Sequence, residues 1–244
     1  MAASESSFLS KKPVPRSDRL IVALDLDSAS AALEFVNQLG DAVTFYKLGL
    51  QLFMAGGYFE LVEELRRRDK NVFVDLKLFD VPETVASAVR ALSKRDVQFA
   101  TVHGNEPMVA AAVREKGHLK ILAVTALTSL DRTDLDALGF SCNVEELVLS
   151  RARRALALGC DGVVSSGLEA PMLRSELGDR LFVVTPGIRP VENRPSDDQK
   201  RVVDVEQAFR GGADYIVVGR PIRSAANPRE AALGIQRTIA TLFD

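Results

Sequence analysis

Short apolar runs recur along the chain and alternate with longer segments in which apolar residues follow helical spacing. Compact runs bounded by polar residues are typical of buried strands. Eight such runs are present, at residues 20–25, 43–49, 72–77, 97–104, 120–127, 161–166, 181–187 and 214–219.

The segments between the runs carry helix signals. Residues 28–40 open with Ser28 and Ser30, which are candidate N-caps. Residues 143–159 place apolar side chains on a rough helical period and end at Gly159. A strand followed by a helix is therefore the repeating unit of the chain.

Repeated strand and helix units predict a parallel sheet with right-handed crossovers. Eight units in 244 residues favour closure into a single α/β domain, the (β/α)8 or TIM barrel, whose usual length is about 250 residues. An open dinucleotide-binding sheet is disfavoured, because no GxGxxG motif follows the first strand. We expect the barrel to occupy residues 19–244 and to follow a loose, polar N-terminal arm at residues 1–18.

The composition disfavours several function classes. Hydrophobic residues make up 47% of the chain and the formal net charge is −2, so we expect binding neither to nucleic acid nor to an anionic membrane. No apolar run has the length of a signal peptide or a membrane span. Cys142 and Cys160 form no CxxC pair, and neither a zinc site nor a disulfide framework is indicated. These features fit a protein of the reducing cytoplasm.

Charged residues interrupt the third apolar run, "VFVDLK". Because side chains alternate along a strand, Asp75 and Lys77 share the face of Phe73, while the aliphatic residues between them face the helices. In a closed barrel, chemistry gathers at the carboxyl ends of the strands. We expect Asp75 and Lys77 there, together with Asp25 from the first strand and Lys47 from the second.

A lysine between carboxylates has a defined chemical capacity. Each nearby negative charge favours the protonated form, so Lys77 can donate a proton or stabilise a developing anion but is a poor Schiff-base nucleophile. A structural ion pair between Asp75 and Lys77 is the alternative. Asp80 also has two interpretations, because Asp80, Pro82 and Glu83 form a capping-box pattern for the next helix. The pattern alone does not decide between cap and catalyst.

The last two strands are followed by motifs that contain glycine and arginine, "TPGIRP" and "VVGRPI". The loops after strands 7 and 8 are the usual phosphate site of this barrel. Gly187 and Gly219 would let backbone N–H groups approach phosphate oxygens, while Arg189 and Arg220 would supply charge, the latter as a bidentate fork. Ordinary turn glycines and solvated surface arginines remain the alternative.

Two further features give weaker signals. Residues 190–200, "PVENRPSDDQK", are polar and aperiodic, which is typical of a loop that closes over a ligand and also of a plain surface loop. His103 is interpreted as a hydrogen-bonded residue beside the site rather than as a catalyst.

Several motifs, taken in order, resemble one known family. From residue 19 to its end the chain is similar to the bacterial orotidine 5′-phosphate decarboxylases at "VALD", "YKLG", "DLKLFDVPETV", "TVHG", "VTALTS", "TPGIRP", "DDQKR" and "VVGRPI". The resemblance implies decarboxylation of orotidine 5′-monophosphate to uridine 5′-monophosphate and CO2, the last step of de novo pyrimidine synthesis. It also implies that the enzyme uses neither a metal nor an organic cofactor and is a homodimer with shared active sites.

The same resemblance implies residue roles. Lys77 is expected to protonate C6 of the pyrimidine as CO2 leaves, within a charged array that includes Asp75 and Asp80 and stabilises a carbanion-like transition state. Asp80 and Thr84 are expected to serve the partner's active site. The implied substrate contacts are Asp25 and Lys47 at the ribose, Thr128 at the pyrimidine, and Arg189, Gln199, Gly219 and Arg220 at the phosphate.

The chain departs from many relatives at "LFDVPET", where they carry histidine before the aspartate and asparagine before the threonine. Phe79 and Glu83 therefore inherit no role from the family.

Two rival functions stay open. A related sugar-phosphate branch, which includes 3-keto-L-gulonate 6-phosphate decarboxylase and hexulose-phosphate synthase, binds magnesium and has glutamate in place of Lys47. A lysine at this position would repel the cation and remove a ligand. The other rival is a nucleotide-phosphate-binding protein without chemistry, which the intact Asp75, Lys77 and Asp80 disfavour.

Overall fold

Eight parallel strands close into a barrel in which each strand pairs with its neighbours in sequence order, as predicted. The computed structural model describes residues 8–189 and 202–243. Strands β1 and β8 pair, with Ile21 opposite Val217, and so complete the ring. Each predicted apolar run overlaps one strand. The strands are β1 Leu20–Ala23, β2 Phe45–Gly49, β3 Asn71–Leu78, β4 Phe99–His103, β5 Lys120–Val124, β6 Gly162–Val164, β7 Phe182–Thr185 and β8 Tyr215–Val218.

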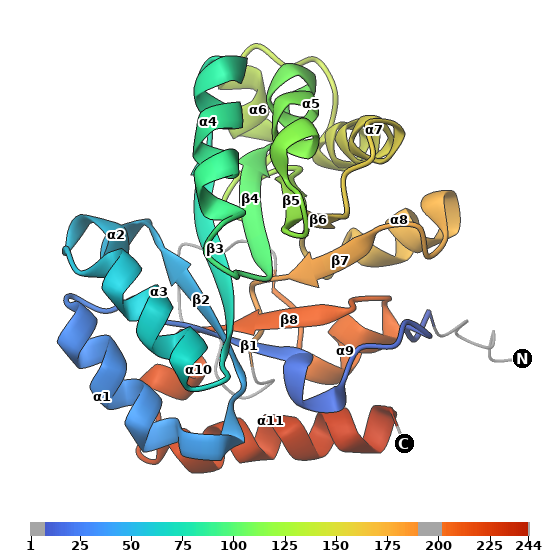
Figure 1. Ribbon diagram of the computed structural model, residues 1–244. Helices are drawn as coiled ribbons and strands as arrows, with labels where there is room; N and C mark the ends of the chain where they lie inside the picture. Colours follow the sequence, from blue (N-terminus) through green and yellow to red (C-terminus); the bar gives the residue numbers. More distant parts are fainter. Residues whose placement is uncertain (1–7, 190–201, 244) are drawn as a thin grey trace, which may run out of the picture.

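The helices surround the strands, as Figure 1 shows. Most strands lead into a helix that returns along the outside of the barrel, which is the arrangement expected of right-handed β-α-β units. The helices are α1 Ala29–Leu39, α2 Leu50–Met54, α3 Tyr58–Arg67, α4 Pro82–Leu92, α5 Glu106–Glu115, α6 Arg132–Ala137, α7 Val144–Ala157, α8 Ala170–Leu177, α9 Val205–Arg210, α10 Arg220–Arg223 and α11 Pro228–Leu242.

Local capping residues determine where two of the helices begin and end. The Ser28 hydroxyl accepts a hydrogen bond from the Ala31 N–H at 3.1 Å, which confirms it as the N-cap of α1. Helix α7 begins with a capping box between Asn143 and Glu146. Beyond its end, Gly159 adopts a φ of 79°, a left-handed conformation that glycine reaches without a steric penalty.

Apolar residues form one layer inside the barrel and another between the strands and the helices. The aromatic rings of Phe45, Phe99 and Tyr215 stand at the first residues of their strands and pack together, with centroids 5.1 to 6.1 Å apart. Val72 and Val74 face the helices, as the alternating pattern predicts. Because the rings fill the amino-terminal half of the barrel, a polar cavity remains at its carboxyl-terminal half.

The described part of the N-terminal arm packs against the barrel. Asp214 is fully buried at the start of β8 and receives the Lys12 ammonium at 3.0 Å and the Arg174 guanidinium at 2.6 Å. The Ser10 hydroxyl also donates to this carboxylate. A buried charge needs such partners, since desolvation would otherwise destabilise it. Ser10 and Lys12 are thus joined to the barrel through Asp214.

Within the described residues, no helix combines the length and the apolar character needed to cross a bilayer. Cys142 and Cys160 are both free thiols. Burial raises the pKa of the Cys160 thiol to about 11, so this side chain is protonated at neutral pH and is a poor nucleophile.

Candidate active site

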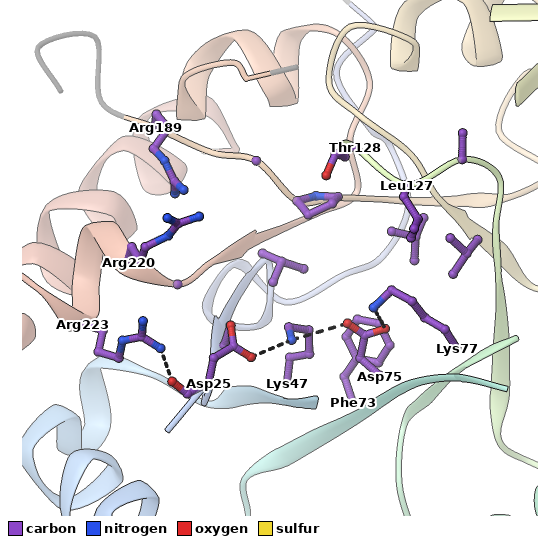
Figure 2. Close-up of a pocket in the computed structure, with 18 residues that line it drawn as sticks. Asp25, Lys47, Phe73, Asp75, Lys77, Leu127, Thr128, Arg189, Arg220 and Arg223 are labelled. Atoms are coloured by element: carbon purple, nitrogen blue, oxygen red, sulfur yellow. Dashed lines mark hydrogen bonds and ion pairs between the residues drawn. The ribbon is translucent and has the colours of Figure 1, made fainter. Parts of the chain in front are cut away.

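A cavity of about 240 Å³ opens at the carboxyl ends of the strands. Figure 2 shows side chains near the ends of early strands, such as Asp25 and Lys77, and side chains that follow the last strands, such as Arg189 and Arg220, converging on this cavity. Nine of the residues expected from the sequence line this cavity, namely Asp25, Lys47, Asp75, Lys77, Thr128, Gly187, Arg189, Gly219 and Arg220.

Four of these residues form a line of alternating charge along one side of the cavity (Figure 2). Asp25 Oδ1 lies 3.2 Å from Lys47 Nζ, which lies 3.4 Å from Asp75 Oδ2. The other oxygen of Asp75, Oδ1, lies 2.9 Å from Lys77 Nζ. Asp75 is therefore bracketed by two ammonium groups, and Lys77 is the terminal charge that faces the open cavity.

The electrostatics of this line favour its charged form. Burial disfavours ionisation of Asp75, but the charges of Lys47 and Lys77 and hydrogen bonds to the carboxylate outweigh it and hold the pKa of Asp75 below its usual range. Burial also lowers the pKa of Lys47, but the neighbouring Asp75 and Asp25 outweigh this effect, so its pKa is raised. Asp75 and Lys47 are therefore both charged at neutral pH.

Strand β3 places Lys77 by an irregularity that alternation alone does not predict. Val74 pairs with Ala100 and Leu78 with Val102, so three residues of β3, numbers 75 to 77, lie opposite one residue of β4. Such a bulge bends a strand and redirects its side chains. Lys77 has a φ of 48°, a left-handed conformation that is uncommon for a residue other than glycine. Backbone strain of this kind concentrates at functional sites.

Asp80 and Thr84 lie outside this cavity. Helix α4 begins after Val81, whose side chain provides no cap, so Asp80 and Glu83 do not form the capping box that was one of the two interpretations of Asp80. The Asp80 carboxylate instead accepts a hydrogen bond from the adjacent Val81 N–H at 2.6 Å. Asp80 and Thr84 are both exposed, on the β3–α4 connection and the first turn of α4.

The end of the cavity opposite Lys77 is cationic. Figure 2 shows Arg189, from the loop after β7, and Arg220, the first residue of α10, reaching toward one another. Gly219 immediately precedes α10, and Gly187 has a φ of 80°, which suits a tight turn next to a ligand. Gln199 and the loop expected at residues 190–200 lie outside the described residues.

Two residues that adjoin the site were missed by the sequence reasoning. Arg223, one helical turn after Arg220, lines the cavity and donates to the backbone carbonyl of Asp25. Thr101, on β4, contacts Asp75 and the backbone of Lys77. The spacing of Arg223 from Arg220 is a local signal, whereas the contacts of Thr101 depend on the bulge in β3.

His103 lies beside the site. Its ring packs against that of Phe79 at an angle of 44°, with centroids 4.6 Å apart, and Nδ1 lies 3.0 Å from Asn105 Oδ1. Burial lowers the pKa of His103, and its hydrogen bond with Asn105 only partly offsets this effect. Its ring is therefore neutral at physiological pH.

No cluster of three or more histidine, cysteine or carboxylate side chains suited to a metal occurs in the described part of the chain. The donors around the cavity are carboxylates already paired with ammonium groups. Carboxylates that are already paired with ammonium groups are poorly placed to bind a divalent cation.

Comparisons with known proteins agree with this geometry. The sequence model of the orotidine 5′-phosphate decarboxylase / HUMPS family matches residues 18–235. The chain is 68% identical over 237 residues to an orotidine 5′-phosphate decarboxylase of Methylococcus capsulatus, covering 97% of this chain and 98% of that protein. It is 48% identical to that of Stenotrophomonas maltophilia, covering 96% and 98% of the two chains.

A solved structure of the same family has a similar fold. The crystal structure of orotidine 5′-phosphate decarboxylase from Lactobacillus acidophilus superposes with a TM-score of 0.80 at 34% identity, covering 91% of this chain and 99% of that one. The chain belongs to the orotidine 5′-phosphate decarboxylase / HUMPS family.

Proposed function

We propose that this protein is a carboxy-lyase that converts orotidine 5′-monophosphate to uridine 5′-monophosphate and CO2. The relatives named above carry this activity in their names. The observation that carries the proposal is the line of alternating charge from Asp25 to Lys77 in a cavity whose other end holds Arg189 and Arg220. The charged side chains would contact the pyrimidine ring that reacts, while the arginines bind the phosphate.

In the proposed reaction the bond between C6 and the carboxylate breaks, and the electron pair stays on C6 as CO2 leaves. The Lys77 ammonium stabilises this developing negative charge and then gives C6 a proton, which leaves a neutral amine that regains a proton from solvent. Asp75 holds the ammonium 2.9 Å from its own oxygen and thereby fixes its direction. Charges that are placed before the reaction need no reorganisation during it, and this is the main source of electrostatic catalysis.

The other contacts orient the substrate. Asp25 and Lys47 are proposed to hold the ribose, and Thr128 the pyrimidine. Arg220 and Gly219 are proposed to bind the phosphate together with Arg189 and Gln199. Lys77 and these groups supply the chemistry and the binding without a metal or an organic cofactor.

The active form is proposed to be a cytoplasmic homodimer in which Asp80 and Thr84 complete the partner's site. Both residues are exposed, and neither lines the cavity of its own chain. Phe79 and Val81, on either side of Asp80, are 61% and 62% exposed. Exposed apolar side chains of this kind are typical of a surface that another protein covers.

The magnesium-dependent sugar-phosphate branch is the nearest rival function, and Lys47 argues against it. Its ammonium lies within ion-pair distance of both Asp25 and Asp75. It thus holds the carboxylates that a divalent ion would need and repels that ion.

The direct test follows the ultraviolet absorbance of orotidine 5′-monophosphate as the purified protein acts on it, with and without EDTA. We expect EDTA-insensitive turnover. In Lys77→Ala turnover should fall by several orders of magnitude while nucleotide binding stays measurable, because the interaction is made mainly in the transition state. A Lys77→Ala variant with near-normal kcat would contradict the role of Lys77 as proton donor. A wild-type protein that does not turn over orotidine 5′-monophosphate would contradict the proposed function.

A further inference from the structure

A buried hydroxyl lies where the bulge of β3 meets β4. Thr101 is 1% exposed and does not line the cavity. It stands two residues after Phe99 on the inward face of its strand, opposite the three residues of the bulge. No other residue of β4 falls between the paired positions Ala100 and Val102.

This hydroxyl makes two contacts at once. Its oxygen accepts a hydrogen bond from the Lys77 backbone N–H at 2.9 Å, and its proton is donated to Asp75 Oδ1, also at 2.9 Å. The same Oδ1 accepts from Lys77 Nζ at 2.9 Å. The backbone of Lys77, the carboxylate of Asp75 and the ammonium of Lys77 are thus joined through one side chain of the neighbouring strand.

We propose that Thr101 is a positioning residue that fixes the direction of the Lys77 ammonium by bridging the Lys77 backbone to the Asp75 carboxylate. The bulge interrupts the regular pairing of β3 with β4 at Lys77, and an unpaired backbone N–H away from water would be destabilising. The hydroxyl satisfies this donor and so stabilises the left-handed backbone of Lys77. It also limits rotation of the carboxylate that holds Nζ. The inference rests on the proposed role of Lys77 in proton donation.

The experiment compares Thr101→Val, Thr101→Ser and Thr125→Val with the wild type. Valine keeps the shape of threonine but loses the hydroxyl, whereas serine keeps it. Thr125 is a matched control, because its hydroxyl is also buried, at the end of β5, but donates to the backbone carbonyl of Val164. Each variant is assayed for kcat and KM with orotidine 5′-monophosphate, for uridine 5′-monophosphate affinity and for thermal unfolding.

We expect Thr101→Val to lower kcat roughly 10- to 100-fold, the range for loss of one hydrogen bond to a charged group. KM and affinity for uridine 5′-monophosphate should change little, since Thr101 does not line the cavity. Thr101→Ser should recover most of the loss, and Thr125→Val should keep wild-type kcat. The inference would be overturned by a Thr101→Val variant with normal kcat, or by a folded Thr101→Ser variant that loses as much activity as valine.

Carbon-13 titration of the Asp75 carboxyl group provides a readout that is independent of the substrate. Burial raises the pKa of Asp75, but the charges of Lys47 and Lys77 together with smaller contributions from the hydrogen bonds of Lys77 and Thr101 outweigh it and lower the pKa. Removal of the Thr101 donor should therefore raise this pKa in Thr101→Val, and serine should restore it. The acid limb of kcat/KM should move to higher pH in the same variant. An unchanged Asp75 titration in Thr101→Val would refute the bridge even if orotidine 5′-monophosphate proved not to be the substrate.

Discussion

Asp75 is the residue on which most contacts of the site converge. One of its oxygens accepts from Lys77 and Thr101, and the other pairs with Lys47. A buried carboxylate is stable in its charged form only with such partners. The alternation of charge is thus a structural requirement of the buried array as well as its proposed source of catalysis. The ion-pair and catalytic interpretations of Asp75 and Lys77 are therefore compatible.

The proposed binding of the substrate phosphate by Arg220 can also be tested at the scale of a single residue. Arg220→Ala should lower kcat/KM for orotidine 5′-monophosphate far more than for the phosphate-free nucleoside, because binding energy from a remote group can be directed to the reacting centre. Steady-state kinetics with both substrates measure the difference. Arg237→Ala is a suitable control, since Arg237 is exposed on α11 and pairs with Glu230 at 2.7 Å. Equal losses for both substrates in Arg220→Ala would remove Arg220 from the site.

At the scale of elements, the closing strand β8 depends on the buried ion pair at its start. Asp214 accepts from the Val183 N–H of β7 and the Arg174 guanidinium of α8, and Lys12 of the arm completes its partners. One carboxylate thus links the arm, a helix and two strands on the face of the barrel opposite the cavity. The barrel that supports the site is closed in part by these contacts.

Asp214→Asn should therefore destabilise the fold with little direct effect on the chemistry. It leaves the Arg174 charge, whose side chain is 3% exposed, without its carboxylate. We expect a loss of about 3 kcal/mol in the free energy of unfolding, the lower end for breaking a buried pair. Denaturant unfolding measures this loss. Asp179→Asn is the control, because Asp179 is 61% exposed and 3.9 Å from the same arginine, and its change should stay within about 0.5 kcal/mol. Similar losses in both variants would contradict the assigned role of Asp214.

The bulge in β3 also belongs to the scale of elements. Period-two alternation correctly predicted that Asp75 and Lys77 point toward the cavity, as it predicted the outward direction of Val72 and Val74. It did not predict the irregular pairing with β4 or the left-handed backbone of Lys77. Alternation is a property of one strand, whereas a bulge is a property of two paired strands.

At the scale of the whole molecule, the proposed contribution of Asp80 to the partner's site can be tested by mixing two variants. A mixture of Lys77→Ala and Asp80→Ala variants, unfolded and refolded together, should regain activity that neither variant has alone. In a mixed dimer one site combines an intact Lys77 from one chain with an intact Asp80 from the other. Turnover of orotidine 5′-monophosphate measures the recovery.

The control for this mixture uses Lys77→Ala with Asp75→Asn. Both altered residues line the cavity of their own chain, 2.9 Å apart in the native protein. Every site in such a mixed dimer lacks one of them, so activity should stay absent. Recovery in the control, or no recovery in the first mixture, would contradict an Asp80 that serves the partner.

The amino-acid sequence by itself determined the number and order of the strands. Hydrophobic periodicity is a property of each local segment and does not depend on how the strands pair. The sequence also identified the strand ends near which Asp25, Lys47, Asp75, Lys77, Arg189 and Arg220 lie, since a closed parallel barrel gathers its carboxyl ends at one rim. Only the tertiary structure decided which atoms meet. The bridge made by Thr101, the anchoring of Asp25 by Arg223 and the burial of Asp214 beneath the arm join residues distant in sequence. Their distances are fixed by how the strands pair and the barrel closes, which no local pattern encodes.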